Sequence, residues 1–480
     1  MSLPSYLTGG SKNNFFYDIK KILTFSHRTH YESDKSKDSS NVNTYVAKLH
    51  HTEDFISATV GAYEMGVSAT MANIQSRTGL TEFDRDFEGF IADWSQSPET
   101  SGRFFRGDLE QAEVREFAVL SGGYLEVDHF SKSFEFGYKV EFVNLNAVDQ
   151  TENDFSKNIY YGIKTSKRFG KITAIKVFTD NSRTKSVWIP YSRCRLVINR
   201  WASTEQYNGI APVAPILKGL KYTKEYHDEE MNSAKRRSRN NVLIKSPYFS
   251  EMLNKALKVL KGKSAIDAYE EAFNSRRVDG DNVNGVRYID ENEEPIELGR
   301  GVDNPYQDIM RNKTRAMSAA VRLSPMLTVG EMPSSYNAML YFHQKDENVF
   351  GSVHQKLVWL SWRPRTEKLL QGLVLVGKLK LPDFWENPKK YQKLELMRRG
   401  IGHIDPVKQQ KALSEGLTNG TLNPIEVQAK RGVDYEAHIQ ATVDYEIKKK
   451  ELFENAGLQY VQSGFESLLT PEDLINEDDK

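Results

Sequence analysis

The feature that most constrains this chain is a pair of long helical patterns separated by a run of helix-breaking residues, all within residues 303–377. The first pattern covers residues 304–323, and the breaker run follows at 324–335. Asn304 suits the N-cap of a helix, and Pro305 suits its first turn, where a missing N–H costs nothing. The second pattern begins directly after the breaker run. The sequence therefore predicts a long helix, a short loop and another long helix in succession.

The second helix repeats apolar residues over 336–362 and then meets Pro364, which should kink or divide it. From residue 403 onward the pattern is again helical, with short turns expected at Gly420 and Gly432. The chain closes on an acidic tail.

Another helical pattern, residues 213–240, precedes an insert that separates it from the helix at 304–323. Within the insert we expect a short strand at 242–244, an amphipathic helix at 251–273 and a strand pair at 280–298. The chain thus goes out along one helix, forms a small domain, and returns along the other.

Both of these helices are basic. A helix of about 20 residues is roughly 30 Å long, a length over which B-DNA carries roughly 18 phosphate charges. Cations at a helix C-terminus also interact favourably with the helix dipole. A solvated helix end and a contact with nucleic acid or a partner therefore both remain open. The basic residues are Lys235, Arg236, Arg237 and Arg239 on the first helix, and Arg311, Lys313, Arg315 and Arg322 on the second.

The N-terminal part combines helices with a β unit. Residues 1–45 are polar, and we expect a loosely ordered arm that is either disordered or lies on a neighbouring subunit. Helical patterns are expected at 46–75, at 81–95 with an apolar stripe, and at 109–120. Gly122 and Gly123 after the third helix suit a left-handed stop.

After residue 124, apolar residues recur at every second position, so residues 124–198 are expected to form a mostly antiparallel β unit. A hairpin is expected with Gly170 in its turn. Cys194 lies in an alternating run at 187–198, which favours a buried, inert thiol.

Composition excludes several classes of protein. The 65 Lys and Arg balance the 65 Asp and Glu, which argues against tight binding of nucleic acid by the whole surface. A single cysteine excludes an internal disulfide framework and a cysteine-rich metal site. The sequence contains no run of about 18 apolar residues and no signal-peptide pattern, so we expect a protein of a reducing cytoplasm.

The sequence also offers no catalytic constellation. Gly262-Lys263-Ser264 lacks the glycine of a phosphate-binding loop, because Leu257 occupies that position. The HExxH pattern of zinc proteases does not occur, and the ten histidines are scattered. We therefore expect no enzyme, no cofactor and no metal.

The C-terminal motifs resemble a known family. The run from Ile404 to Lys408, which contains Asp405-Pro406, and the run from Lys430 to Glu436 are similar to the C-terminal signature of lambda-like tailed-bacteriophage portal proteins. The order of weaker motifs agrees over residues 80–460. These motifs are Phe87 to Trp94, Gly122-Gly123-Tyr124, Gly162-Ile163-Lys164 with Gly170, Trp188-Ile189-Pro190, Tyr207 to Pro215, and Ser334-Ser335-Tyr336-Asn337-Ala338.

The sequence departs from the family pattern in several places. After the Ser-Ser pair it has Asn337-Ala338-Met339 and lacks the usual arginine. Gly402-His403-Ile404 replaces the tryptophan expected before Asp405-Pro406. The N-terminal arm and the insert at 246–302 match the family poorly, so their roles rest on topology.

The resemblance implies an α+β portal fold with a mixed wing domain, a two-helix stem, a small α/β clip, a long tunnel helix and a helical crown. Such subunits form a ring, usually of twelve, and a ring buries repeated helix faces through one heterologous interface. The implied segments are an arm at 1–45, the wing at 46–222 and 338–400, stem helices at 223–245 and 303–325, a clip at 246–302, a tunnel loop at 326–337 and a crown at 401–480.

The implied function is a head–tail connector through which double-stranded DNA is packaged and ejected. The implied partners are the terminase large subunit, the major capsid and scaffold proteins, and the head–tail adaptor, with no membrane. The protein would be located at a capsid vertex in the virion, and in the host cytoplasm during assembly. The basic stem residues would contact phosphates, contact capsid, or only pack the stem. The tunnel-loop residues would be Val329, Gly330, Glu331, Met332, Pro333, Ser334 and Ser335.

Two other classes stay open at this point. One is a different virion structural protein, such as a capsid or scaffold component. The other is a DNA-processing enzyme of the packaging machinery, which would need a metal or nucleotide site that the sequence does not show.

Overall fold

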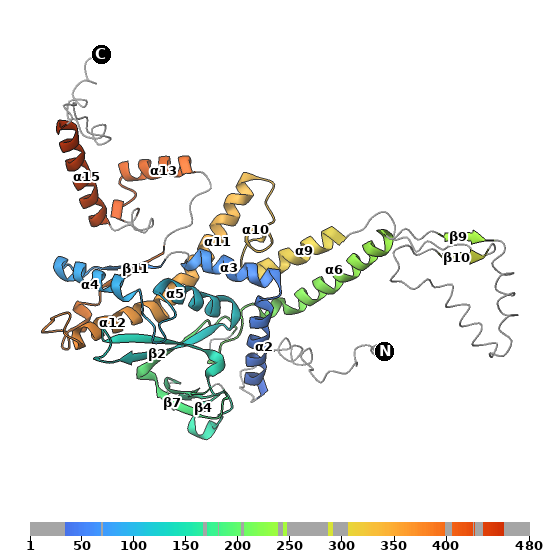
Figure 1. The fold of residues 1–480 in the computed structure, drawn as a ribbon, viewed down its shortest axis with the longest axis horizontal. Helices are drawn as coiled ribbons and strands as arrows, with labels where there is room; N and C mark the ends of the chain where they lie inside the picture. Colours follow the sequence, from blue (N-terminus) through green and yellow to red (C-terminus); the bar gives the residue numbers. More distant parts are fainter. Residues whose placement is uncertain are drawn as a thin grey trace, which may run out of the picture. The chain divides into compact units, whose positions relative to one another are not determined.

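The protein is a mixed α+β chain with two compact units, residues 1–214 with 321–480, and residues 215–320 (Figure 1). This computed structural model describes residues 34–68, 71–166, 170–180, 182–202, 206–238, 243–246, 287–290, 306–398, 406–425, 427 and 435–455. The expected helix at 251–273, the cap at Asn304-Pro305 and the turn at Gly432 lie outside the described residues.

The first unit begins with helices α2 (Asp34–His50) and α3 (Asp54–Ser68). Residues 34–45 were expected in an irregular arm, but here they belong to α2. The reason is tertiary, because Asn43 is buried and joins the helix to distant backbone. Its Nδ2 donates to the Gly209 carbonyl over 3.1 Å, and its Oδ1 accepts from the Ala211 N–H over 3.0 Å.

Three helical segments follow. In α4 (Thr81–Trp94) the buried stripe is Phe83, Phe87, Ile91 and Trp94, which confirms the predicted amphipathic helix. Helix α5 (Arg106–Arg115) continues as the π-helical segment η2 (Glu116–Leu120). It stops at Gly122, whose φ of 69° confirms the left-handed stop.

Two antiparallel sheets confirm the predicted β unit. One has the order β3-β2-β8, and the other has the order β4-β5-β6-β7. The β5–β6 pair is the predicted hairpin, and Gly170 has a φ of 61°. The strands are β2 (Gly123–Phe130), β3 (Tyr138–Asn144), β4 (Ile159–Tyr160), β5 (Ile163–Thr165), β6 (Ile172–Phe178), β7 (Ser186–Pro190) and β8 (Cys194–Ile198).

The expected strand run at 187–198 is divided. A 3-10 turn, η5 (Tyr191–Arg193), separates β7 from β8 and sends them to different sheets. Cys194 is buried in the core that the two sheets share, and burial raises the pKa of its thiol to about 12. An inert thiol is therefore the physical expectation at neutral pH.

A long helical run packs behind the first sheet. Helix α11 (Tyr336–Leu357) passes through the π-helical segment η7 (Val358–Trp362) into α12 (Arg363–Leu375). Pro364 lies in the first turn of α12, so the division was predicted correctly. Gly372 brings α12 against the sheet, because a Cβ there would come within 2.7 Å of the Phe136 carbonyl. The α4 stripe, β3 and α12 share one hydrophobic core.

One small sheet was not predicted. Strand β1 (Asn73–Ser76) pairs antiparallel with β11 (Leu394–Met397), although the sequence pattern favoured a helix through residue 75. Helix α3 ends at Ser68 instead. A strand of four residues has too little periodicity to be distinguished from the end of a helix.

The second unit contains the antiparallel helix pair α6 (Leu217–Ser238) and α9 (Tyr306–Ala320). Gly219 near the start of α6 faces Met317 near the end of α9. The rings of Tyr226 and Tyr306 pack with centroids 5.4 Å apart. Between the helices, β9 (Leu243–Ser246) and β10 (Arg287–Asp290) pair in parallel. The predicted helix–insert–helix order is thus confirmed for the described residues.

The remaining elements are short or C-terminal. Helix α10 (Pro325–Val329) precedes α11, and the C-terminal helices are α13 (Pro406–Thr418) and α15 (Tyr435–Asn455). Gly420 follows α13 with a φ of 67°, as the predicted turn requires. The 3-10 segments are η3 (Leu145–Ala147), η4 (Phe155–Lys157), η6 (Ala214–Ile216) and η8 (Pro388–Lys390).

Candidate functional site

The candidate site is the succession of α9, the linker at 321–335 and the first half of α11. Helix α9 belongs to the second unit, and the residues from Val321 onward belong to the first. Each part is therefore described by itself.

Helix α9 has one buried face and one basic, exposed face. Met317 and Ser318 are buried. Arg311 and Arg315 are exposed and four residues apart, so they share a face of the helix. Lys313 is also exposed, on another part of the helix surface. This face presents cations to solvent, the arrangement that a contact with phosphates requires.

The basic residues of α6 occupy its end. Residues 235–237 lie in the last turn of α6. Arg239 lies outside the described residues. Of the eight predicted cations, the structure therefore describes the side chains of Arg311, Lys313, Arg315 and Arg322.

Arg322 occupies a strained turn directly after α9. Its φ of 67° is left-handed, a conformation that costs a non-glycine residue roughly 1–2 kcal/mol. The preceding Val321 carbonyl accepts a hydrogen bond of 2.8 Å from the Tyr63 hydroxyl of α3. Tertiary contacts therefore hold the chain in this turn.

The breaker run is only partly a loop. Residues 326–329 were expected in the tunnel loop, but Pro325 to Val329 form α10. Pro325 favours the first turn of a helix, and Gly330 ends it with a φ of 68°. The irregular segment is therefore residues 330–335, which we call the 330–335 loop.

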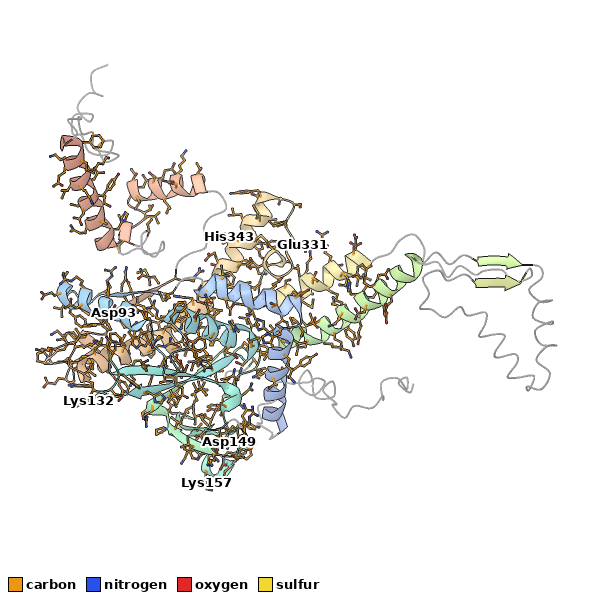
Figure 2. The ribbon with its side chains drawn as sticks, in the orientation of Figure 1. Asp93, Lys132, Asp149, Lys157, Glu331 and His343 are labelled. Atoms are coloured by element: carbon orange, nitrogen blue, oxygen red, sulfur yellow. The ribbon has the colours of Figure 1, made fainter. Side chains whose placement is uncertain are left out.

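The 330–335 loop is exposed except at Glu331 and Pro333, which are partly buried, and it carries a single charge, that of Glu331. Met332 is 71% exposed. The Glu331 N–H donates to the Pro325 carbonyl over 3.2 Å, and the Ser335 hydroxyl accepts from the Ala338 N–H as the N-cap of α11. Figure 2 labels Glu331 in this loop and His343 in the first half of α11. Both ends of the loop are thus closed by helix caps.

Helix α3 is the platform on which α10 and the second half of α11 rest. A Cβ at Gly66 would come within 2.4 Å of the Phe350 ring, so only glycine permits this approach of α3 and α11. The Tyr63 ring meets the same Phe350 edge-on. Arg398 donates to the Gly66 carbonyl over 2.7 Å and forms an ion pair with Glu347. Because every residue of 336–345 is at least partly exposed, the first half of α11 extends beyond this packing.

A buried ion network lies behind α11 and was not predicted. Arg365 of α12 forms ion pairs with Glu113 of α5 and Glu126 of β2. Arg195 of β8 binds the same Glu126 over 2.7 Å and Asp128 over 2.9 Å. The sequence holds no signal for this network, because its five members are scattered over the four elements α5, β2, β8 and α12.

Groups around the π-helical segment η7 complete this network. Trp362 donates from Nε1 to Glu113 over 2.6 Å, and Ser361 donates from its hydroxyl to Glu126 over 2.6 Å. Burial raises the pKa of Glu113 to about 8, although Arg365 opposes the shift. Burial would also raise the pKa of Glu126, but Arg365 and Arg195 outweigh it and hold that pKa at about 2.

The described residues contain no group of three or more His, Cys, Asp or Glu side chains that could hold a metal. Within the part of the chain that the structure describes, every helix is too short or too polar to span a membrane.

A comparison with protein families gives the decisive observation. Residues 33–345 match the model of the family described as "Phage portal protein, lambda family", which is well over half of the chain. The chain belongs to this family. Membership confirms the resemblance inferred from sequence motifs, and it agrees with a structural rather than an enzymatic portal protein.

The matched span includes α9 and the 330–335 loop, and it ends before the Asp405-Pro406 motif. A similar solved structure is a chain titled "Neck of native GTA particle computed with C12 symmetry". Sequence identity to it is 13%, the alignment covers 81% of this chain and 93% of that chain, and the TM-score is 0.39. A search of curated proteins found no match.

Proposed function

We propose that this portal-family chain forms a ring of twelve subunits at one vertex of a phage capsid, and that double-stranded DNA passes through its channel during packaging and ejection. The observation that carries this proposal is the family match over residues 33–345, which includes both sheets of the first unit, both helices of the second unit and the 330–335 loop. In the virion the ring acts as a head–tail connector.

We propose the following assignment of regions to the parts of a portal subunit. The two sheets and the helices packed on them form the wing, α6 and α9 form the stem, and residues 246–302 form the clip. The 330–335 loop is the tunnel loop, and residues 401–480 form the crown. This mapping follows the order of segments expected from the sequence, but α6 begins at Leu217 rather than at 223, α9 ends at Ala320 rather than at 325, and α10 shortens the tunnel loop.

The charge distribution suits a passage for DNA. The 330–335 loop carries one acidic residue and no cation, so it offers phosphates no ion pair at the constriction. Arg311 and Arg315 of α9 supply exposed cations that contact phosphates transiently. Weak and balanced contacts allow DNA to slide, whereas a dense basic lining would hold it.

Different partners bind different regions of the ring. The clip docks the terminase large subunit during packaging and the head–tail adaptor afterwards. The major capsid and scaffold proteins contact the outside of the ring. Assembly takes place in the host cytoplasm, and the mature location is the capsid vertex.

Negative-stain imaging of the purified full-length chain tests the ring directly. Rings with a central hole are expected, and class averages should show their symmetry. Shells or monomers at all concentrations would rule out the portal assignment. Hydrolysis of ATP by the pure protein would also count against it.

Two deletions test the regions of the ring. Removal of residues 329–333 should leave rings intact but impair packaging or retention of DNA. Removal of residues 250–300 should abolish binding of the terminase motor while the wing stays folded. Normal packaging by the first variant, or motor binding by the second, would refute the corresponding assignment.

A further inference from the structure

A buried carboxylate joins α11 to the start of the linker. Asp346 is 2% exposed, although it lies where α11 leaves its packed half. Its Oδ1 accepts the backbone N–H of Ser324 over 2.8 Å, and its Oδ2 accepts the Ser324 hydroxyl. A buried charge is costly unless it is hydrogen-bonded, and Ser324 supplies both of these bonds.

The bond from the Ser324 hydroxyl replaces an ordinary helix cap. Ser324 is the N-cap of α10, and an N-cap serine normally accepts a hydrogen bond from a backbone N–H of the first turn. In this protein its side chain makes no such bond and donates to Asp346 instead. The contact between α10 and α11 is therefore made at the expense of local helix capping.

The residues around this contact are also fixed. Thr328 of α10 is 3% exposed, and its hydroxyl donates to the Ser324 carbonyl over 3.2 Å. Leu323 is fully buried, and the Val321 carbonyl is held by Tyr63. Six residues after Ser324, a Cβ added at Gly330 would meet only open space. The linker thus changes from buried to exposed within one short helix.

We propose that Asp346 is the positioning residue of the tunnel loop, holding Ser324 and α10 on α3 so that only the 330–335 loop is free to move. We call the pair of Asp346 and Ser324 the anchor. What the loop does to DNA rests on the proposed function, whereas the anchor itself can be tested without DNA.

The single cysteine of the chain makes a direct test possible. Thr328→Cys places a second thiol in α10, and its rate of reaction with a maleimide reports undocking of that helix. Cys194 is buried in the wing core and serves as the internal control for general unfolding. Both thiols are followed by peptide mass spectrometry in the full-length chain.

Asp346→Ala in this background should raise the labelling rate at position 328 by on the order of tenfold or more, because two hydrogen bonds to a charged group are lost. Cys194 should label as slowly as before. Asp346→Asn keeps an acceptor for the Ser324 N–H and should stay within a few fold of the parent. Gln344→Ala, an exposed change two residues away on the same helix, is the matched control and should have no effect.

An unchanged rate at position 328 in Asp346→Ala would overturn the proposal. Equal acceleration at both thiols would also overturn it, because Asp346 would then stabilise the whole unit rather than position α10. If Thr328→Cys prevents folding, Val321→Cys on the other side of Ser324 is the second buried probe. A DNA-packaging assay of Asp346→Ala rings then tests the loop's role separately, since normal packaging with an undocked α10 would contradict the proposed function and not the anchor.

Discussion

This protein has two charged regions that both contain arginines but differ in how deeply those arginines are buried. The ion network of Arg365, Arg195, Glu113, Glu126 and Asp128 is buried between α5, the first sheet and α12. The basic face of α9 uses the same arginine side chain in solvent. Burial makes the first region a rigid structural element, because an unpaired charge there has no water to replace its partner. Exposure makes the second available for weak contacts that salt and water screen.

The largest expected effect is the loss of Arg365. Arg365→Ala leaves Glu113 and Glu126 without their shared partner, which should lower the free energy of unfolding by about 3–5 kcal/mol. Urea denaturation followed by circular dichroism measures the change. The control is Arg363→Ala, which removes a half-exposed arginine with an ion pair to Glu367 and should cost about 1 kcal/mol or less. Equal losses in the free energy of unfolding for the two variants would show that burial does not make Arg365 more important to stability than Arg363.

The second prediction concerns a proton in the buried network. Glu113 has a folded-state pKa of about 8, above its ordinary value, so folding favours its protonated form. Its contribution to stability is therefore complete below about pH 4.5 and is lost as the pH rises toward 8. Over that window we expect the free energy of unfolding to fall by roughly a few kcal/mol.

Glu113→Gln tests the proton directly. The amide mimics the neutral carboxyl, so the fall in stability between pH 5 and 8 should flatten. Denaturation curves at several pH values provide the measurement, and Glu395→Gln, at the exposed position of β11, is the control. If the pH dependence of the variant equals that of the parent, Glu113 does not carry the proton. Glu126 acts in the opposite direction, since its lowered pKa stabilises the fold above about pH 4.5 and that contribution is lost in acid.

The third prediction moves to the exposed region. Arg311→Ala with Arg315→Ala should change stability by less than about 1 kcal/mol. Non-specific binding of double-stranded DNA by rings should weaken, and the slope of log K against log salt should fall by roughly one for each lost phosphate contact. Fluorescence anisotropy at several salt concentrations measures both quantities. An unchanged slope would assign the two arginines to packing or to capsid contact instead.

The smallest expected effect on folding is in the tunnel loop. Glu331→Lys should alter stability by less than about 0.5 kcal/mol, because the loop is exposed. It adds a cation at the proposed constriction, so packaging should slow. Glu331→Gln removes the charge without adding a cation and should package at nearly the parental rate. Identical rates for both variants would place the loop away from DNA.

The sequence predicted elements better than it predicted contacts. The stripe of α4 and the return helix α9 follow from apolar residues three or four positions apart, and the division of the long helix follows from Pro364 alone. The small sheet of β1 and β11 joins residues more than 300 positions apart and was missed. Helix α10 was also missed. Ser324 and Pro325 indicate a helix breaker when only their neighbours along the chain are considered, and the contact of Ser324 with Asp346 exists only in the folded protein.

By itself the sequence determined the helix–insert–helix order, the antiparallel β unit and the resemblance to portal proteins. Local periodicity and turn residues encode these features, since each depends on neighbours along the chain. Only the tertiary structure decided which charges are buried, where the tunnel loop begins and what holds it. Those properties depend on which distant side chains share a low-dielectric interior, and five charged residues spread from position 113 to position 365 show no such arrangement until the chain has folded.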